Sequence, residues 1–205
     1  MGLILNYTKG QTPLAEDEKE GLKIKSISTR EELNEFEQQN IEAAQTWLMG
    51  QNITLNNLLT EQFIKNLHFK MFGLVWSWAG IYRKSDKSIG IDWRKIGVGV
   101  KELLDDCLFW IENKTFSEEE IAIRLKHRLV KIYPFPNGNG RHSRLIADIL
   151  MEKVFHRPIF SWGGISLNSI DDGRSVYIKA LREADEGNYK SLLEFAKSNN
   201  SKNSK

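Results

Sequence analysis

The stretch Tyr133–Arg144 reads YPFPNGNGRHSR, and it decides how the middle of the chain folds. Its prolines and glycines all lie between Pro134 and Gly140, and they interrupt both helices and strands. An apolar-periodic segment ends just before this stretch, at Ile132, and a second one begins just after the glycines. The stretch therefore predicts a helix, a proline-bearing loop and a second helix.

The residue types of this loop indicate an anion-binding site. The first N–H groups of a helix lack intrahelical partners and lie at the positive end of its dipole, where phosphate binds. Gly138 and Gly140 let the backbone approach an anion without Cβ interference, and Asn139 is expected to take a left-handed conformation or to brace the loop. Arg141 and Arg144 lie three positions apart near the first helical turn, and two guanidinium groups for one anion indicate a polyphosphate.

A simpler interpretation is a helix connection in which the glycines only permit a tight turn and the arginines point into solvent. The loop is not a Walker loop, because the chain has no G-x-x-x-x-G-K-[ST] pattern, and it is not a Rossmann fingerprint, because no G-x-G-x-x-G follows a strand. The density of glycine, asparagine and arginine in this stretch favours the anion site.

Helical patterns dominate the remaining chain and predict an all-α fold. Thr29–Glu32 and Ser117–Glu120 read as capping boxes that begin helices, and Gly187 marks a break in the last helix. The expected helices start at Thr29, run over about 60–72 and 93–113, end at Ile132, continue from Gly140 to before Pro158, and close the chain over about 175–195. Residues 82–91 are short and polar, and they predict an exposed β-hairpin.

Composition indicates one domain. The chain has 205 residues and a formal net charge of +2, with basic and acidic residues interspersed, so we expect neither a nucleic-acid nor a membrane partner. Residues 1–28 are predicted to form an N-terminal extension, 29–197 the domain, and 198–205 a disordered tail. Cys107 is expected to be a buried thiol in a reducing compartment, and the absence of a leader pattern predicts a cytoplasmic protein.

The segment Pro134–Arg144 matches P-F-x-x-G-N-G-R-x-x-R, and this pattern resembles the signature of the Fic (filamentation induced by cAMP) domain family. The segments HRLVKIYPF, MFGLVWSWAGIYRKSD and YIKALREADEGNYKSLLEF are also similar to Fic core segments. TPLAEDEKEGL and TREELNEFEQQNIEAAQTWL resemble the branch called mobile mystery protein B. The resemblance spans Thr12 to Phe195 and implies an all-helical Fic-fold bundle with a short β-hairpin flap.

The resemblance also implies an activity, the transfer of AMP from Mg-ATP to a hydroxyl side chain of a target protein. The glycine–asparagine–glycine run would then form the anion nest, and Asn139 would also touch the α-phosphate. Arg141 and Arg144 would hold the β- and γ-phosphates, and Phe135 would anchor the loop in the core. A target segment would lie across the flap, which comprises Lys84, Ser85, Asp86, Lys87, Ser88, Ile89 and Gly90.

Two positions depart from the family pattern. Tyr133 stands where the family has the histidine that acts as general base, and a phenol with a pKa near 10 is a poor base at neutral pH. Asn137 stands where the family commonly has the acidic Mg²⁺ ligand, so the metal is expected to be held mainly by the phosphates. We therefore expect ATP binding with slow transfer or none.

Other activities and regulators stay open at this point. The chain would be either a Fic adenylyltransferase, possibly a toxin, or a catalytically silent nucleotide-binding module, or a relative that transfers UMP, phosphate or phosphocholine. It lacks the family's inhibitory pattern [S/T]-x-x-x-E-[G/N]. This predicts a separate antitoxin that supplies a glutamate to Arg144.

Histidines and tryptophans near these segments have simpler interpretations. His127 is expected to be a buried, hydrogen-bonded structural residue. His142 falls in the first turn after the loop and is expected to lie beside the nucleotide, where it could contact it. Trp76 and Trp78 are expected to pack in the core.

Overall fold

The computed structural model describes residues 13–164 and 172–198, which contain helices and no strand. The α-helices are α1 (Glu16–Glu20), α2 (Arg30–Met49), α3 (Leu55–Leu58), α4 (Glu61–Phe72), α5 (Ile96–Glu112), α6 (Glu118–Ile132), α7 (Asn139–Ile149), α8 (Asp172–Asp185) and α9 (Lys190–Lys197). Short helical turns lie at η1 (Trp93–Lys95) and η3 (Trp162–Gly164), and a π-helical turn, η2 (Leu150–Val154), extends α7. The all-α prediction is confirmed.

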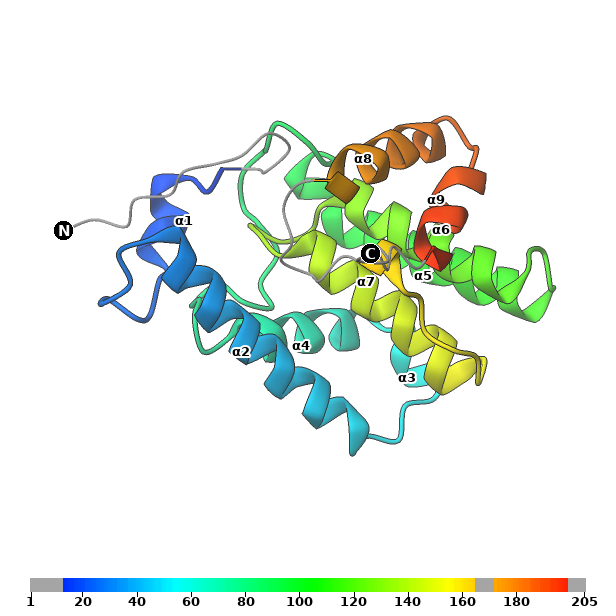
Figure 1. Ribbon diagram of the computed structural model, residues 1–205, viewed down its shortest axis with the longest axis horizontal. Helices are drawn as coiled ribbons and strands as arrows, with labels where there is room; N and C mark the ends of the chain where they lie inside the picture. The colour runs from blue at the N-terminus through cyan, green and yellow to red at the C-terminus, as the bar shows by residue number, and fades with distance from the viewer. Residues whose placement is uncertain (1–12, 165–171, 199–205) are drawn as a thin grey trace, which may run out of the picture.

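Helices α6 and α7 lie at the centre of the bundle (Figure 1). Helices α2 and α4 pack on each other on one side, while α5 packs on α6 and the α8–α9 pair closes the other side. The residues on both sides of the loop 133–138 belong to one continuous apolar core, and Phe135 is fully buried in it. The loop is thus held between two buried helices, which fixes its backbone.

Local sequence signals set most helix ends. The Thr29 hydroxyl accepts a hydrogen bond from Glu32 N at 3.2 Å, and the Glu32 carboxylate accepts one from Thr29 N at 3.1 Å, which completes the predicted capping box. Ser117 caps α6 with its hydroxyl, which accepts from Glu120 N at 3.3 Å. The last helix is broken at Gly187, where φ is +92°.

The predicted β-hairpin at 82–91 is wrong in its backbone form. This segment has no strand, and its bends are held by the Arg83 side chain, which donates hydrogen bonds to the carbonyls of Ser85 and Ile91. These side-chain bonds occupy carbonyl groups that a two-stranded ladder would have used. The segment is an irregular loop.

The segment before α2 packs on the domain. Leu14, Leu22 and Ile27 are buried in the common core, and Leu22 forms an isolated antiparallel bridge with Trp76. The side chain of Glu18 in α1 binds Lys87. Of the predicted extension 1–28 the structure describes 13–28, and of the predicted tail 198–205 it describes only residue 198.

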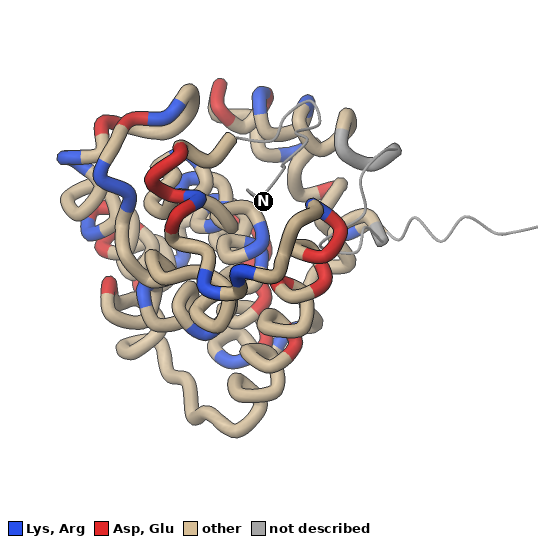
Figure 2. Tube along the Cα trace, turned by 90° about the vertical axis from the view of Figure 1, so that its left-hand side faces the viewer, with Lys and Arg blue, Asp and Glu red and all other residues tan. Residues whose placement is uncertain are grey.

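Cys107 is buried, and burial raises the pKa of its thiol to about 12. Figure 2 shows lysines and arginines distributed along the trace together with acidic residues. Among the described helices, none has both the length and the apolar character that a membrane crossing needs.

Candidate functional site: the loop between α6 and α7

Tyr133 ends α6 in a left-handed conformation. Its φ and ψ are +55° and +60°, and its N–H donates to Leu129 O at 3.2 Å. Its carbonyl accepts from Arg83 Nε at 2.7 Å, and only 8% of the residue is exposed. A left-handed conformation is costly for a residue with a Cβ, so the surrounding contacts must hold it.

Asn139 braces the loop with both ends of its side-chain amide. Its Oδ1 accepts from Phe135 N at 3.0 Å, and its Nδ2 donates to Phe135 O at 2.8 Å. Of the two roles expected for Asn139, the structure has the brace. The left-handed conformation falls instead on Gly138, whose φ is +78° and where an added Cβ would lie 2.6 Å from the Phe72 ring.

Gly140 differs from Gly138. Its φ is not in the left-handed region, and an added Cβ would meet nothing within 4 Å. It lies in the first turn of α7, where the backbone N–H groups lack intrahelical acceptors. The conformation therefore does not require glycine here, whereas an anion approaching the N-terminus of α7 would benefit from the missing Cβ.

His68 of α4 packs against the loop and supports it, a role that the sequence did not reveal. Its Nε2 lies 3.0 Å from Asn137 O, and its Nδ1 accepts from Gly80 N at 3.0 Å. The ring stacks on Phe135 with centroids 3.7 Å apart. Because one ring nitrogen donates and the other accepts, the imidazole is neutral, and burial lowers its pKa well below the usual value.

Arg141 lies in a mostly buried ion pair. Its Nη1 is 2.7 Å from Glu37 Oε2, and the side chains of Arg141 and Glu37 are 17% and 5% exposed. Trp76 Nε1 donates to the other Glu37 oxygen at 2.6 Å, and the guanidinium lies 4.8 Å from the Phe72 ring centroid. Glu37 therefore connects α2 to the first turn of α7 and restricts the directions in which Arg141 can reach an anion.

Arg144 lies one turn further along α7, among aromatic side chains. Its guanidinium is 4.9 Å from the Tyr177 ring and 5.9 Å from the Trp162 ring. The Tyr177 hydroxyl accepts from the fully buried Lys126, and the positive charges of Lys126 and Arg144 lower its pKa against the opposing effect of burial. Within the described residues the buried Nε of Arg144 has no hydrogen-bond partner, so Arg144 retains donor capacity.

Asn137, which the resemblance places at a metal-ligand position, offers little to a cation. Its Oδ1 already accepts from Gly138 N at 2.6 Å, and its carbonyl contacts His68. Nowhere in the described ranges do three or more His, Cys, Asp or Glu side chains come together in a metal-binding group. The residues therefore do not fit a metal site built from protein ligands alone.

The flap segment, residues 84–90, lies directly against the start of the loop. An added Cβ on Gly90 would come within 2.7 Å of Tyr133 Cβ, so flap and residue 133 are adjacent. Lys84, Ser85, Ser88 and Ile89 are exposed, whereas Lys87 is engaged by Glu18 and its side chain is 6% exposed. The structure thus brings the predicted flap and Tyr133 together.

The structure agrees with the prediction for His127 and disagrees with the one for His142. His127 is 3% exposed, contacts Asp185 at 3.2 Å and Tyr189 at 3.3 Å, and burial lowers its pKa to about 4, so the structural interpretation is confirmed. The expectation for His142 is wrong. Its ring is fully buried, its Nε2 lies 3.0 Å from Ile64 O, and burial lowers its pKa to about 3. It faces α4, because the face of α7 that carries it packs there.

Trp76 is fully buried and stacks on Trp78 with ring centroids 4.8 Å apart, so their predicted core role is confirmed.

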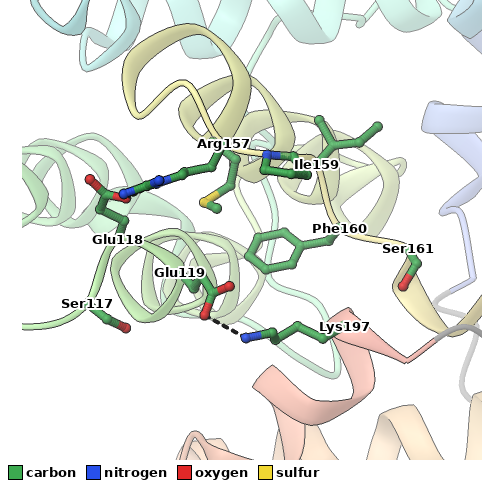
Figure 3. Close-up of a pocket in the computed structure, with 10 residues that line it drawn as sticks. Ser117, Glu118, Glu119, Arg157, Ile159, Phe160, Ser161 and Lys197 are labelled. Atoms are coloured by element: carbon green, nitrogen blue, oxygen red, sulfur yellow. Dashed lines mark hydrogen bonds and ion pairs between the residues drawn. The ribbon is translucent and has the colours of Figure 1, made fainter.

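A separate pocket of about 630 Å³ opens at the other end of α6 (Figure 3). Its charged side chains pair with one another, Arg157 with Glu118 at 2.6 Å and Lys197 with Glu119 at 2.7 Å. This pocket is distant from the loop and is not part of the site.

Comparison with known proteins finds a family match that spans the loop. The model of the Fic/DOC family matches residues 58–151. A Fido domain-containing protein of Dictyostelium discoideum is 30% identical over 114 residues, which cover 52% of this chain and 71% of that protein. The protein adenylyltransferase Fic of Aedes aegypti is 24% identical over 159 residues, which cover 76% of this chain but only 30% of that protein.

A solved structure gives the same result for the fold. The BepC protein of Bartonella tribocorum, a VirB-translocated effector crystallised with bound AMPPNP, superposes with a TM-score of 0.65 at 17% identity, covering 85% of this chain and 89% of that chain. The N-terminal Fic domain of the Bep8 protein from Bartonella sp. 1-1C superposes with a TM-score of 0.66 at 16% identity, covering 89% of this chain and 92% of that chain. The helical arrangement described above is therefore one found in Fic domains.

Proposed function

This chain belongs to the Fic/DOC family, and from that premise we propose that it is a protein adenylyltransferase, which transfers AMP from ATP to a hydroxyl side chain of a target protein. The observation that carries the proposal is the loop before α7. Gly138 is left-handed, Gly140 leaves open space and Asn139 braces the loop, so the N-terminus of α7 can take an anion, and Arg141 and Arg144 follow in the first two turns. The relatives named as an adenylyltransferase and as an AMPPNP complex support the choice of ligand and reaction.

In the proposed reaction the hydroxyl oxygen of the target attacks the α-phosphorus of ATP. A bond forms between that oxygen and the phosphorus, the bond from the α-phosphorus to the oxygen bridging to the β-phosphate breaks, and pyrophosphate leaves. The hydroxyl proton must pass to a base. In this proposal residue 133, which ends α6 beside the flap, would be that base. A phenol is ionised in only about one molecule in a thousand at neutral pH.

We infer that Mg²⁺ enters with the nucleotide. The Asn137 amide oxygen already accepts a hydrogen bond, and the loop has no carboxylate at this position. The β- and γ-phosphates would supply the metal's oxygen ligands, and the metal would neutralise their charge. Metal affinity without nucleotide is expected to be weak.

A second candidate function follows from Tyr133. A chain that keeps the phosphate loop but lacks a histidine at its head would act as a nucleotide-dependent binding module without transfer. Labelled ATP separates the candidates, with the purified protein as enzyme and a lysate as the source of targets. If the chain is an adenylyltransferase, the α-label of ATP is transferred to target proteins. A silent module retains ATP in calorimetry but labels nothing, and γ-label alone indicates phosphate transfer. Absence of ATP binding contradicts both candidates.

Regulation by a second protein stays a prediction. The unsatisfied Nε of Arg144 among the described residues would suit a carboxylate from an antitoxin. Addition of a neighbouring gene product that lowers ATP affinity in the parent protein, but not in Arg144→Met, would support it. Equal affinity with and without that product would contradict it.

A further inference from the structure

Arg83 is a buried arginine. Among the described residues its side chain donates hydrogen bonds only to backbone carbonyls, and these belong to two separate segments. It is 2% exposed, its Nη1 donates to Ser85 O at 2.8 Å, and its Nη2 donates to Ile91 O. On the other side its Nε donates to Tyr133 O at 2.7 Å, and its Nη2 lies 3.5 Å from Ile132 O. One guanidinium thus joins the flap segment to the head of the loop.

The backbone repeats this connection at both ends of the flap segment. Arg83 N donates to Pro134 O at 2.9 Å, and Ile91 N donates to Ile132 O at 3.4 Å. Gly90, with φ +95°, lets the chain return, because an added Cβ would lie 2.9 Å from Arg83 Nη2 and 3.1 Å from Ile132 O. The flap segment is therefore a closed loop that starts and ends on residues 132–134.

The charge of Arg83 is compensated by carbonyl dipoles more than by an acid. Its closest carboxylate, from Asp86, is 3.7 Å away on a side chain that is 63% exposed. The last carbonyls of α6 lack intrahelical donors and lie at the negative end of the helix dipole, where a cation is stabilised. A buried guanidinium is costly unless its donors are satisfied, and here they are satisfied by main-chain atoms. Hydrogen bonds to main-chain carbonyls fix the path of the backbone independently of the side chains that those residues carry.

We propose that Arg83 is a positioning residue that holds the flap segment in register with residue 133. The proposal rests on the adenylyltransferase function above: a target segment lying on the flap and the base at position 133 would meet at the α-phosphate only if both backbones keep this spacing. Arg83 touches neither nucleotide nor target. A lysine could not replace it, because one ammonium cannot reach the carbonyls on both sides through a fixed planar fork.

Hydrogen–deuterium exchange of the chain as it stands tests the connection without any ligand. In Arg83→Lys we expect exchange to rise at least about tenfold in two separate peptides, one covering residues 84–91 and one covering 130–135, while α2 and α5 keep their protection. Arg94→Lys makes the same chemical change at an arginine whose side chain is 68% exposed and whose partner is Asp92, and it should leave both peptides unchanged. A rise in the flap peptide alone, or a uniform rise, would overturn the proposal.

Transfer of α-labelled AMP gives the functional test in the Tyr133→His background. Arg83→Lys should keep the ATP dissociation constant within about threefold, while label transfer falls by on the order of a hundredfold, because small misplacements of reacting groups have large effects on rate. A variant that binds ATP and transfers at the parental rate would refute positioning. If the parent itself neither binds nor transfers, the proposed function fails, and the exchange result still decides whether Arg83 connects the two segments.

A second variant covers the case in which Arg83→Lys does not fold. Gly90→Ala keeps the arginine itself but inserts a methyl group 2.7 Å from Tyr133 Cβ and 2.9 Å from Arg83 Nη2 at the same junction. It should raise exchange in both peptides and lower transfer without a large change in ATP affinity. Unchanged exchange in both would contradict the close approach of flap and residue 133.

Discussion

Glu37 and Arg141 form a mostly buried ion pair between α2 and α7, with 2.7 Å between Oε2 and Nη1 and with Trp76 donating to the second carboxylate oxygen. Removal of one partner leaves the other charge buried without compensation, which costs more than the pair itself contributes. Glu37→Gln should therefore lower the free energy of unfolding by about 3 kcal/mol. Urea denaturation measures this loss, with the exposed Glu35→Gln of the same helix as control.

A double-mutant cycle tests whether the effect belongs to the pair. Arg141→Met should cost clearly less stability in the Glu37→Gln background than in the parent, with a coupling of about 1 kcal/mol or more. Additive losses would show that Glu37 acts through Trp76 alone.

The two glycines of the loop should respond to alanine in opposite ways. Gly138→Ala places a Cβ 2.6 Å from the Phe72 ring at a left-handed position and should destabilise the fold. Gly140→Ala has free space and should keep or raise stability by up to about 1 kcal/mol, since alanine favours helix. If the N-terminus of α7 binds phosphate, Gly140→Ala should still weaken ATP binding by at least about tenfold, or 1.4 kcal/mol. Calorimetry that shows parental affinity would favour the simple turn.

Local signals made the fold predictable. The capping residues Thr29 and Ser117 and the change of pattern at Gly138 specify helix ends through contacts a few residues apart, and the structure has these ends where they were expected. The flap failed as a hairpin because Arg83 bonds to carbonyls that a ladder would have used. That arginine contacts residues 132 and 133, and no pattern in its own segment reveals such a distant partner.

The residues that support the site were missed for the same reason. Glu37 occupies the apolar face of α2 between Leu33 and Ile41, and a carboxylate at that register was the available signal of a buried partner. The sequence does not identify that partner as Arg141, because Arg141 comes 104 positions later and several helices lie between the two residues in the chain. His68 gave no comparable signal, since a histidine within an amphipathic helix is unremarkable.

Acid should destabilise this protein between about pH 6.5 and pH 5, before most carboxylates titrate. Burial lowers the pKa of His142 to about 3, that of His127 to about 4 and that of His68 well below its usual value. Below about pH 6.5 the histidines of the unfolded chain therefore bind protons, whereas those of the folded chain stay neutral. Stability is full above about pH 6.5 and falls below it, by up to about 2 kcal/mol per histidine at pH 5. Asp148, whose pKa burial raises to about 7, opposes this trend as a single group.

Urea unfolding at several pH values measures that slope. His127→Gln should flatten it, because glutamine can bond to Tyr189 but does not titrate. The same substitution at the exposed His156 is the matched control. A stability that is constant from pH 7 to about pH 5 would contradict the buried neutral state of these histidines.

Tyr133→His should restore a base at the head of the loop. Histidine is tolerated in the left-handed conformation that this position requires, so the substitution should not lower the unfolding free energy. Its imidazole has a pKa near neutrality, and a positioned base contributes roughly a hundred- to ten-thousandfold in rate. Transfer of α-labelled AMP should increase by that order, while the ATP dissociation constant stays at the parental value. Tyr133→Phe separates the roles of ring and hydroxyl: it should transfer as slowly as the parent, and a further loss in Phe would show that the phenol already serves as the base.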